Sequence, residues 1–249
     1  MREHTTDHQP LTFLQTVLLS PPNILTCCNL ICGCMATGAA FHGHFEWALG
    51  MIVLGAVFDF FDGMVARLLG ISSPIGKELD SLADVVTFGV APSAMLFQLF
   101  GMVHYPEAIA GFQPYLPYTA FIMAAFSALR LAKFNLDTRQ TSSFIGLPTP
   151  ANALFWASLT VTQLPFLVSQ RFNAIFLFLF MLMFSFFLVA EVPLFALKFK
   201  NLSWADNRVK WIFIAGTLIA AVAMGVSAIP VIILWYIALS LLAWRFHFA

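Results

Sequence analysis

Four aspartates stand close together in a sequence that is strongly apolar on both sides of them. They are Asp59, Asp62, Asp80 and Asp84. Acidic groups are costly to place in a membrane-like sequence, so by default they mark a functional site. Asp59 and Asp62 are three positions apart, and Asp80 and Asp84 are four apart, so each pair lies on one face of a predicted helix.

The segment between the two pairs predicts a turn. Residues Gly70 to Lys77 are rich in Gly, Ser and Pro, which favour chain reversal. The helix after the turn is expected to open with Glu78 and Asp80, because acidic residues are favourable at a helix N-terminus. Two antiparallel helices joined in this way can point all their aspartates at one another.

Carboxylates packed together repel one another unless cations lie between them. Hard oxygen ligands suit Mg²⁺, Mn²⁺ or Ca²⁺. A pair of such ions can bind a diphosphate and stabilise both the attacking and the leaving oxygen of a phosphoryl transfer. The residues alone therefore predict a metal-dependent site for phosphate chemistry, without naming its substrate.

The composition indicates the elements that position this site. Of the 249 residues, 60% are hydrophobic and 10% are charged, whereas soluble domains carry about 25% charged residues. We therefore expect an all-α integral membrane protein. Because a spanning helix needs roughly 20 apolar residues, we expect about eight transmembrane helices, over residues 23–41, 46–69, 80–103, 116–136, 151–169, 174–197, 211–227 and 230–246.

The basic residues predict the orientation in the membrane. If the N-terminus is cytoplasmic, all of the 12 Lys and Arg residues except Arg171 fall at cytoplasmic helix ends or in cytoplasmic loops. Both termini and the aspartate site should then face the cytoplasm, and we expect a bacterial inner membrane protein. The zero net charge shows no nucleic-acid signature.

Four segments are expected along the chain. Residues 1–22 form a cytoplasmic tail with a short interfacial amphipathic helix from Leu11 to Leu19, and residues 23–197 form a six-helix core. Residues 198–210 form a basic cytoplasmic loop, and residues 211–249 add a C-terminal helix pair.

The aspartate stretch resembles the signature of the CDP-alcohol phosphotransferase family, D-x2-D-G-x2-A-R-x8-G-x3-D-x3-D. Every fixed place is filled, by Asp59, Asp62, Gly63, Ala66, Arg67, Gly76, Asp80 and Asp84. The resemblance implies transfer of a phosphatidyl or related group from a CDP-linked donor to an alcohol, with release of CMP. It implies a Mg²⁺ or Mn²⁺ pair, with Ca²⁺ as another possible occupant, and a homodimer.

The resemblance also implies roles for individual residues. Asp59, Asp62, Asp80 and Asp84 would be metal ligands, and Asp84 would also be the general base on the acceptor hydroxyl. The CDP site would comprise Asp59, Gly63, Ala66, Arg67, Gly76 and Asn29. For Asn29, a hydrogen bond between helices is an open alternative to contact with the donor.

Three further stretches are similar to the phosphatidylserine synthase branch of this family. They are PNILTCCNLICG from Pro22, DVVTFGVAPS from Asp84, and RLAKFN from Arg130 followed by GLPTP from Gly146. This similarity implies CDP-diacylglycerol as donor and L-serine as acceptor. We expect Arg130 or Lys133 to receive the serine carboxylate, although both could instead be ordinary cytoplasmic anchors.

Two alternatives stay open. Another acceptor, such as glycerol 3-phosphate or an inositol phosphate, would keep the same family chemistry. A divalent-cation transporter would use an aspartate site at mid-membrane, but the acids lie toward one side and no inverted repeat is visible.

Overall fold

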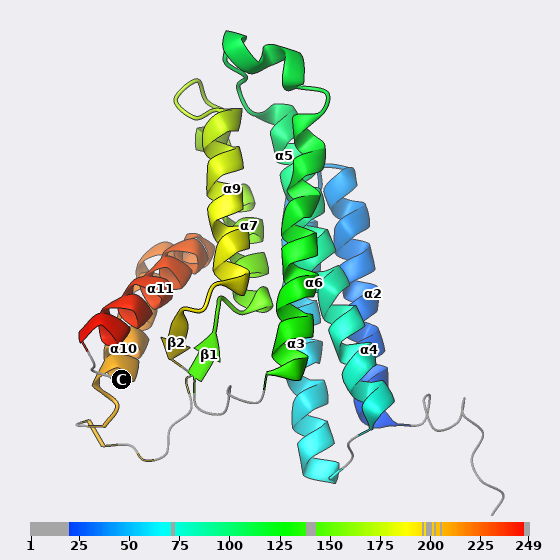
Figure 1. Ribbon diagram of the computed structural model, residues 1–249, viewed down its shortest axis with the longest axis vertical. Coiled ribbons are helices and arrows are strands. Elements are labelled where there is room, and N and C mark those ends of the chain that lie inside the picture. The colour runs from blue at the N-terminus through cyan, green and yellow to red at the C-terminus, as the bar shows by residue number, and fades with distance from the viewer. Residues whose placement is uncertain are drawn as a thin grey trace, which may run out of the picture.

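The structure is a computed structural model that describes residues 20–70, 73–137, 143–195, 197, 201, 203–204 and 206–246. Long helices run side by side along the longest axis of the molecule, and the α10–α11 pair is tilted against them (Figure 1). The predicted interfacial helix from Leu11 to Leu19 lies outside the described residues, as do Arg2, Arg139, Lys198 and Lys200.

Helices make up most of the described chain. The long ones are α2 (Pro21–Phe41), α3 (Phe45–Leu69), α4 (Pro74–Asp84), α5 (Ala91–Met102), α6 (Phe121–Leu136), α7 (Thr149–Thr162), α9 (Ala174–Val189), α10 (Arg208–Met224) and α11 (Ala228–Phe246). A π-helical segment, η1 (Val85–Val90), joins α4 to α5 without a break. The shorter pieces are η2 (Glu107–Phe112), η3 (Leu116–Ala120), α8 (Leu164–Leu167) and η4 (Gly225–Ser227).

Each of the predicted spans overlaps a helix or a succession of helices. By length and composition, five segments of the described chain are apolar enough to cross a membrane: Pro21–Phe41, Phe45–Leu69, Pro74–Met102, Leu116–Leu136 and Arg208–Phe246. The last segment contains both α10 and α11, and α9 is apolar but shorter. The helical membrane architecture agrees with the prediction, while eight crossings and the orientation stay predictions.

The start of α4 differs from the prediction. The helix begins at Pro74 and not at residue 80, because Ser73 caps it by accepting a hydrogen bond from the Gly76 amide at 2.9 Å. Proline is favoured at the first helical position because its missing N–H has no intrahelical partner there. Asp80 consequently lies more than one turn inside the helix.

The end of α9 also differs from the prediction. The helix ends at Val189 instead of continuing to residue 197. Pro193 lacks an amide hydrogen and favours an extended residue before it, which ends a helix. The released segment forms β2 (Pro193–Phe195), which pairs antiparallel with β1 (Ser143–Ile145) in a small two-stranded sheet that the sequence did not predict.

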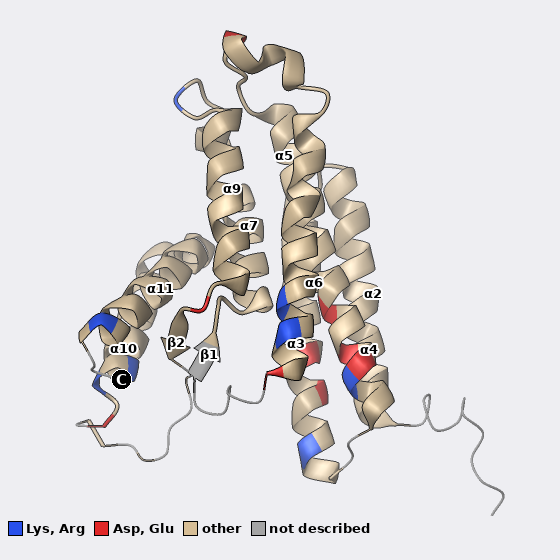
Figure 2. Ribbon diagram, in the orientation of Figure 1, with Lys and Arg blue, Asp and Glu red and all other residues tan. Residues whose placement is uncertain are grey.

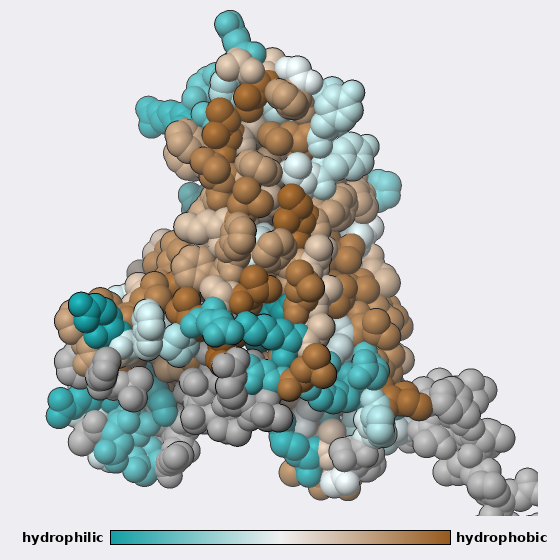
Figure 3. All heavy atoms as spheres, viewed as in Figure 1, coloured by the Kyte–Doolittle hydropathy of each residue, from teal (hydrophilic) through white to brown (hydrophobic). Residues whose placement is uncertain are grey.

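Charge and hydropathy are distributed unevenly along the bundle. Figure 2 shows most of the Lys and Arg positions, in blue, toward the end of the molecule that holds β1, β2 and the start of α4. The acidic positions of α3 and α4, in red, lie toward the same end. On the face shown in Figure 3, hydrophobic residues cover the middle of the molecule, and hydrophilic ones gather at that same end. The aspartates are therefore placed toward the polar end of the helices.

Two glycines allow α2 and α3 to approach η1 closely. A Cβ on Gly33 would lie 2.8 Å from the Cα of Thr87, and one on Gly55 would lie 2.6 Å from its Cγ2. Small residues of this kind let membrane helices pack with their backbones close together. The Thr87 hydroxyl donates to the carbonyl of Asn29 at 3.0 Å, so η1 is fastened to α2 directly above the aspartates.

We predict that Gly33→Ala lowers the thermal unfolding temperature in detergent by several degrees. The added methyl group meets Thr87 backbone, and overpacking costs about 1–3 kcal/mol. Gly38→Ala is the matched control on the same helix, because a Cβ there has nothing within 4 Å. Equal unfolding temperatures for the two variants would show that the close approach at Gly33 is not needed.

Candidate active site

The aspartates of α3 and α4 meet in space. One carboxylate oxygen each from Asp59, Asp62 and Asp80 can be chosen so that all lie within 4.8 Å of one another. The reversal that brings them together starts at Gly70, which ends α3 in the left-handed conformation with φ of 63°. Glycine adopts this conformation without a steric cost. Three of the four aspartates that were predicted to face one another are therefore brought together across the turn.

Asp84 joins this cluster from the last turn of α4. The carboxyl group of Asp59 lies close enough to interact with those of Asp80 and Asp84. Asp84 Oδ1 accepts a hydrogen bond of 3.1 Å from Asn29 Nδ2, and both side chains are buried. Asn29 therefore makes a contact between helices and orients Asp84, while its predicted contact with the donor stays a prediction.

Helix α2 supplies a second polar contact that the sequence analysis did not single out. The hydroxyl of Thr26 donates to Asp62 Oδ2 at 2.6 Å. Asn23, Thr26 and Asn29 recur every three residues and are all buried, so they form one polar face of α2 toward the aspartates. This spacing within an apolar helix was the signal that could have revealed Thr26.

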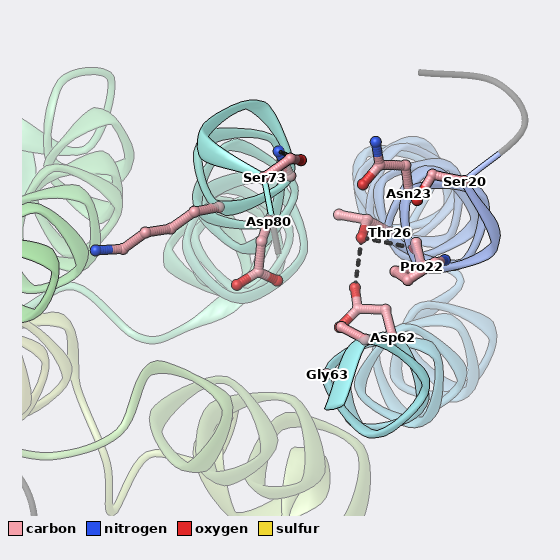
Figure 4. Close-up of a pocket in the computed structure, with 11 residues that line it drawn as sticks. Ser20, Pro22, Asn23, Thr26, Asp62, Gly63, Ser73 and Asp80 are labelled. Carbon is pink, nitrogen blue, oxygen red and sulfur yellow. Dashed lines mark hydrogen bonds between the residues drawn. The ribbon is translucent and has the colours of Figure 1, made fainter. Parts of the chain in front are cut away.

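A pocket of about 330 Å³ opens beside the cluster between α2, α3 and α4. Figure 4 shows Asp62 and Asp80 facing this space from α3 and α4, with Asn23 and Thr26 opposite on α2. Its lining comprises Ser20, Pro22, Asn23, Thr26, Asp62, Gly63, Ala66, Ser73, Gly76, Lys77 and Asp80.

The small residues predicted to bind CDP line this pocket. A Cβ on Gly76 would stand 3.0 Å from both Asn23 Oδ1 and Ser73 Oγ, so a larger residue at this position would narrow the pocket. Arg67 does not line the pocket, but its guanidinium lies over Gly63, 3.6 Å from where a Cβ would be. Gly63, Ala66 and Gly76 thus leave room for a ligand next to the carboxylates.

The donor set fits a hard divalent cation. Asp80 Oδ1 is buried and has no hydrogen-bonding partner among the described residues. Carboxylate oxygens are the ligands that Mg²⁺, Mn²⁺ and Ca²⁺ prefer. Partly buried acids this close to one another also need compensating positive charge. Asp59, Asp62 and Asp80 therefore fit a metal, and Asp84 stands next to them with Asn29 on one oxygen.

The two cations predicted to bind the acceptor have different surroundings. Arg130 is 7% exposed, and its guanidinium lies 5.0 Å from the ring centroid of Phe134 and close enough to Asp84 for their charges to interact. Lys133 instead forms an ion pair of 3.2 Å with Glu191, after the end of α9. Of the two, Arg130 is the one whose charge interacts with the aspartate site.

The sequence of the chain matches a known protein family. The family model of CDP-alcohol phosphatidyltransferase matches residues 19–199. The chain belongs to this family, and the expected membership is confirmed.

Several curated relatives carry the name CDP-diacylglycerol–serine O-phosphatidyltransferase. The protein of Bacillus subtilis (strain 168) is 37% identical over 148 residues, which are 59% of this chain and 79% of the relative. That of Mycobacterium leprae (strain TN) is 30% identical over 230 residues, 89% of this chain and 71% of the relative. That of Helicobacter pylori (strain J99) is 37% identical over 135 residues, and the match spans 53% of this chain and about half, 54%, of the relative.

We predict opposite effects of Asp80→Asn on stability with and without metal. In chelator, the variant should unfold at or above the temperature of the unchanged protein, because one repelling charge is gone. Excess Mn²⁺ should raise the unfolding temperature of the unchanged protein by about 5 to 10 °C and that of the variant much less.

Glu78→Gln is the matched control for this experiment. Glu78 is an exposed acid on α4, two positions from Asp80, and lies outside the cluster. It should respond to Mn²⁺ like the unchanged protein. A full Mn²⁺ response in Asp80→Asn would contradict the assignment of Asp80 as a ligand.

Proposed function

We propose that this chain transfers the phosphatidyl group of CDP-diacylglycerol to L-serine and produces phosphatidylserine and CMP. The observation that carries the proposal is the partly buried aspartate cluster beside a pocket lined by Gly63, Ala66 and Gly76. Family membership and the printed names of the relatives from Bacillus subtilis and Mycobacterium leprae support the same reaction.

In this reaction the pocket holds the CDP part of the donor. Gly63, Ala66 and Gly76 leave space for it, and Arg67 is the nearby cation for its phosphates, since the Lys77 ammonium donates to the carbonyl of Asn135 at 3.1 Å. Asp59, Asp62 and Asp80 hold Mg²⁺ or Mn²⁺, with Asp84 as a further ligand, and Ca²⁺ fits the same oxygens. When bound, the metal neutralises negative charge on the diphosphate.

Asp84 is the residue that receives the proton. The serine hydroxyl oxygen forms a bond to the phosphorus that carries diacylglycerol, and the bond from this phosphorus to the CMP oxygen breaks. The hydroxyl proton goes to Asp84 as general base. Asn29 holds one oxygen of Asp84 at 3.1 Å, which leaves the other oxygen for this role.

Arg130 favours an acceptor with a single carboxylate. Its buried guanidinium stands near Asp84, and charge-assisted pairing with a carboxylate is a strong contact for a single guanidinium. A phosphorylated acceptor would call for several cations, yet Lys133 is already paired with Glu191. Serine is therefore preferred to glycerol 3-phosphate or an inositol phosphate.

The same proposal includes the arrangement in the membrane. The family match over residues 19–199 supports a core at 23–197, with residues 1–22 before it, the loop 198–210 after it, and 211–249 as an added helix pair. We propose eight crossings in a bacterial inner membrane, with both termini and the pocket on the cytoplasmic side, in a homodimer. The gathering of basic residues at the pocket end supports this orientation (Figure 2).

We predict CMP release from CDP-diacylglycerol that depends on L-serine and not on glycerol 3-phosphate. Asp84→Asn should lower kcat with serine by about 10² to 10⁴-fold, because general-base catalysis is lost. Glu78→Gln should keep full activity. Release of CMP with glycerol 3-phosphate but not with serine would contradict the proposed acceptor, and full activity of Asp84→Asn would contradict the proposed base.

A further inference from the structure

A row of buried polar side chains runs along α7 without hydrogen-bonding partners. Thr149, Asn152 and Trp156 are each 0% exposed and recur at helical spacing on one face. Thr149 Oγ1, both polar atoms of the Asn152 amide and Trp156 Nε1 have no partner among the described residues. The aspartate site described above does not include any of them.

Other hydroxyl groups of α7 form hydrogen bonds with the backbone of the helix itself. Ser158, Thr160 and Thr162 each donate to a backbone carbonyl four residues earlier. Thr149 cannot do so, because it is the first residue of α7, and the Asn152 amide has no such partner in the structure. Buried polar groups are almost always paired with protein, water or ligand, and more so where lipid surrounds the protein. The row therefore leaves polar groups that polar atoms from outside the described chain would satisfy.

The start of the row lies at the level of Asp84. Ala153 packs in one cluster with Phe88 and Ala91. Helix α7 and the continuous α4–η1–α5 segment run in the same direction (Figure 1). Moving four residues back from Phe88 gives Asp84, and moving four back from Ala153 gives Thr149. Asp84 and Thr149 therefore each lie about one turn before a residue of this cluster, on neighbouring segments of the bundle, since α7 packs against η1.

Arg130 approaches the same space from α6. Lys133 donates to the carbonyl of Val189, and the Leu147 amide donates to that of Phe187, so α6 and the start of α7 are both tied to the last turn of α9. Arg130 is buried one turn inside Lys133, and its Nε has no partner among the described residues. Unpaired polar atoms of Arg130, Thr149 and Asn152 thus lie on two helices, α6 and α7, that both pack against η1, directly after the carboxylate that acts as base.

We propose that Thr149 and Asn152 form, together with Arg130, the subsite for the amino-acid part of the acceptor. Arg130 pairs with the carboxylate, and the Asn152 amide nitrogen donates to it. The oxygens of Asn152 and Thr149 accept from the ammonium group, which leaves the hydroxyl toward Asp84. Trp156 ends the subsite, since its ring packs against those of Phe180 and Phe184. This inference rests on the proposed transfer to serine.

The test measures KM for both substrates in Asn152→Leu and Thr149→Val, in the full-length protein. Each variant should raise KM for L-serine at least tenfold and change KM for CDP-diacylglycerol less than twofold. Thr160→Val is the matched control on α7: its side chain is equally buried, but its hydroxyl is already bonded to the Trp156 carbonyl at 2.8 Å. The control should keep both KM values.

A second readout separates binding from catalysis. With CDP-diacylglycerol withheld and CDP present, L-serine should raise the unfolding temperature of the unchanged protein and of Thr160→Val, but not of Asn152→Leu. If Asn152→Leu does not fold, Asn152→Ser replaces it, because it adds no bulk and should raise the serine KM in the same way.

The outcomes distinguish this inference from the function on which it rests. If the unchanged protein releases no CMP with serine, the proposed function itself fails, and the subsite fails with it. If the unchanged protein is active and the serine KM of both variants stays within twofold, the subsite alone is overturned. A fall in kcat without a change in serine KM would also overturn it.

Discussion

Mutual repulsion of carboxylates is the constraint on which the rest of the structure depends. Asp59 and Asp62 on α3 face Asp80 on α4 with oxygens within 4.8 Å, in a chain that is 60% hydrophobic. Such an arrangement is stable only when hydrogen bonds and cations compensate the charge. Helix α2 provides part of the compensation, since Thr26 donates to Asp62 and Asn29 donates to Asp84.

The apolar framework serves to bring these groups together. Gly33 and Gly55 leave no side chain between their helices and Thr87, so α2 and α3 approach η1 closely enough for the contacts of Thr26 and Asn29. The π-helical turn starts directly after Asp84, and such turns occur frequently at functional sites. Packing and chemistry are coupled at this point, because a shift of α2 would release two of the acids.

The core of the site could be predicted from the sequence because it depends on local spacing. Two pairs of aspartates on two helices joined by a short turn can face one another, and the long apolar runs predict the helices. Contacts between distant segments could not be predicted in this way. Thr26 meets Asp62 across 36 positions, and Lys133 meets Glu191 across 58. The end of α9 at Val189 depends on the pairing of β2 with β1 as well as on Pro193.

The most direct measurement of the central claim is anomalous diffraction from crystals of the protein grown with Mn²⁺. The account predicts a manganese peak between Asp59, Asp62 and Asp80, within coordination distance of their carboxylate oxygens, and loss of this peak in crystals of Asp80→Asn. Crystals that bind Mn²⁺ only elsewhere, or a peak that persists unchanged in Asp80→Asn, would contradict it.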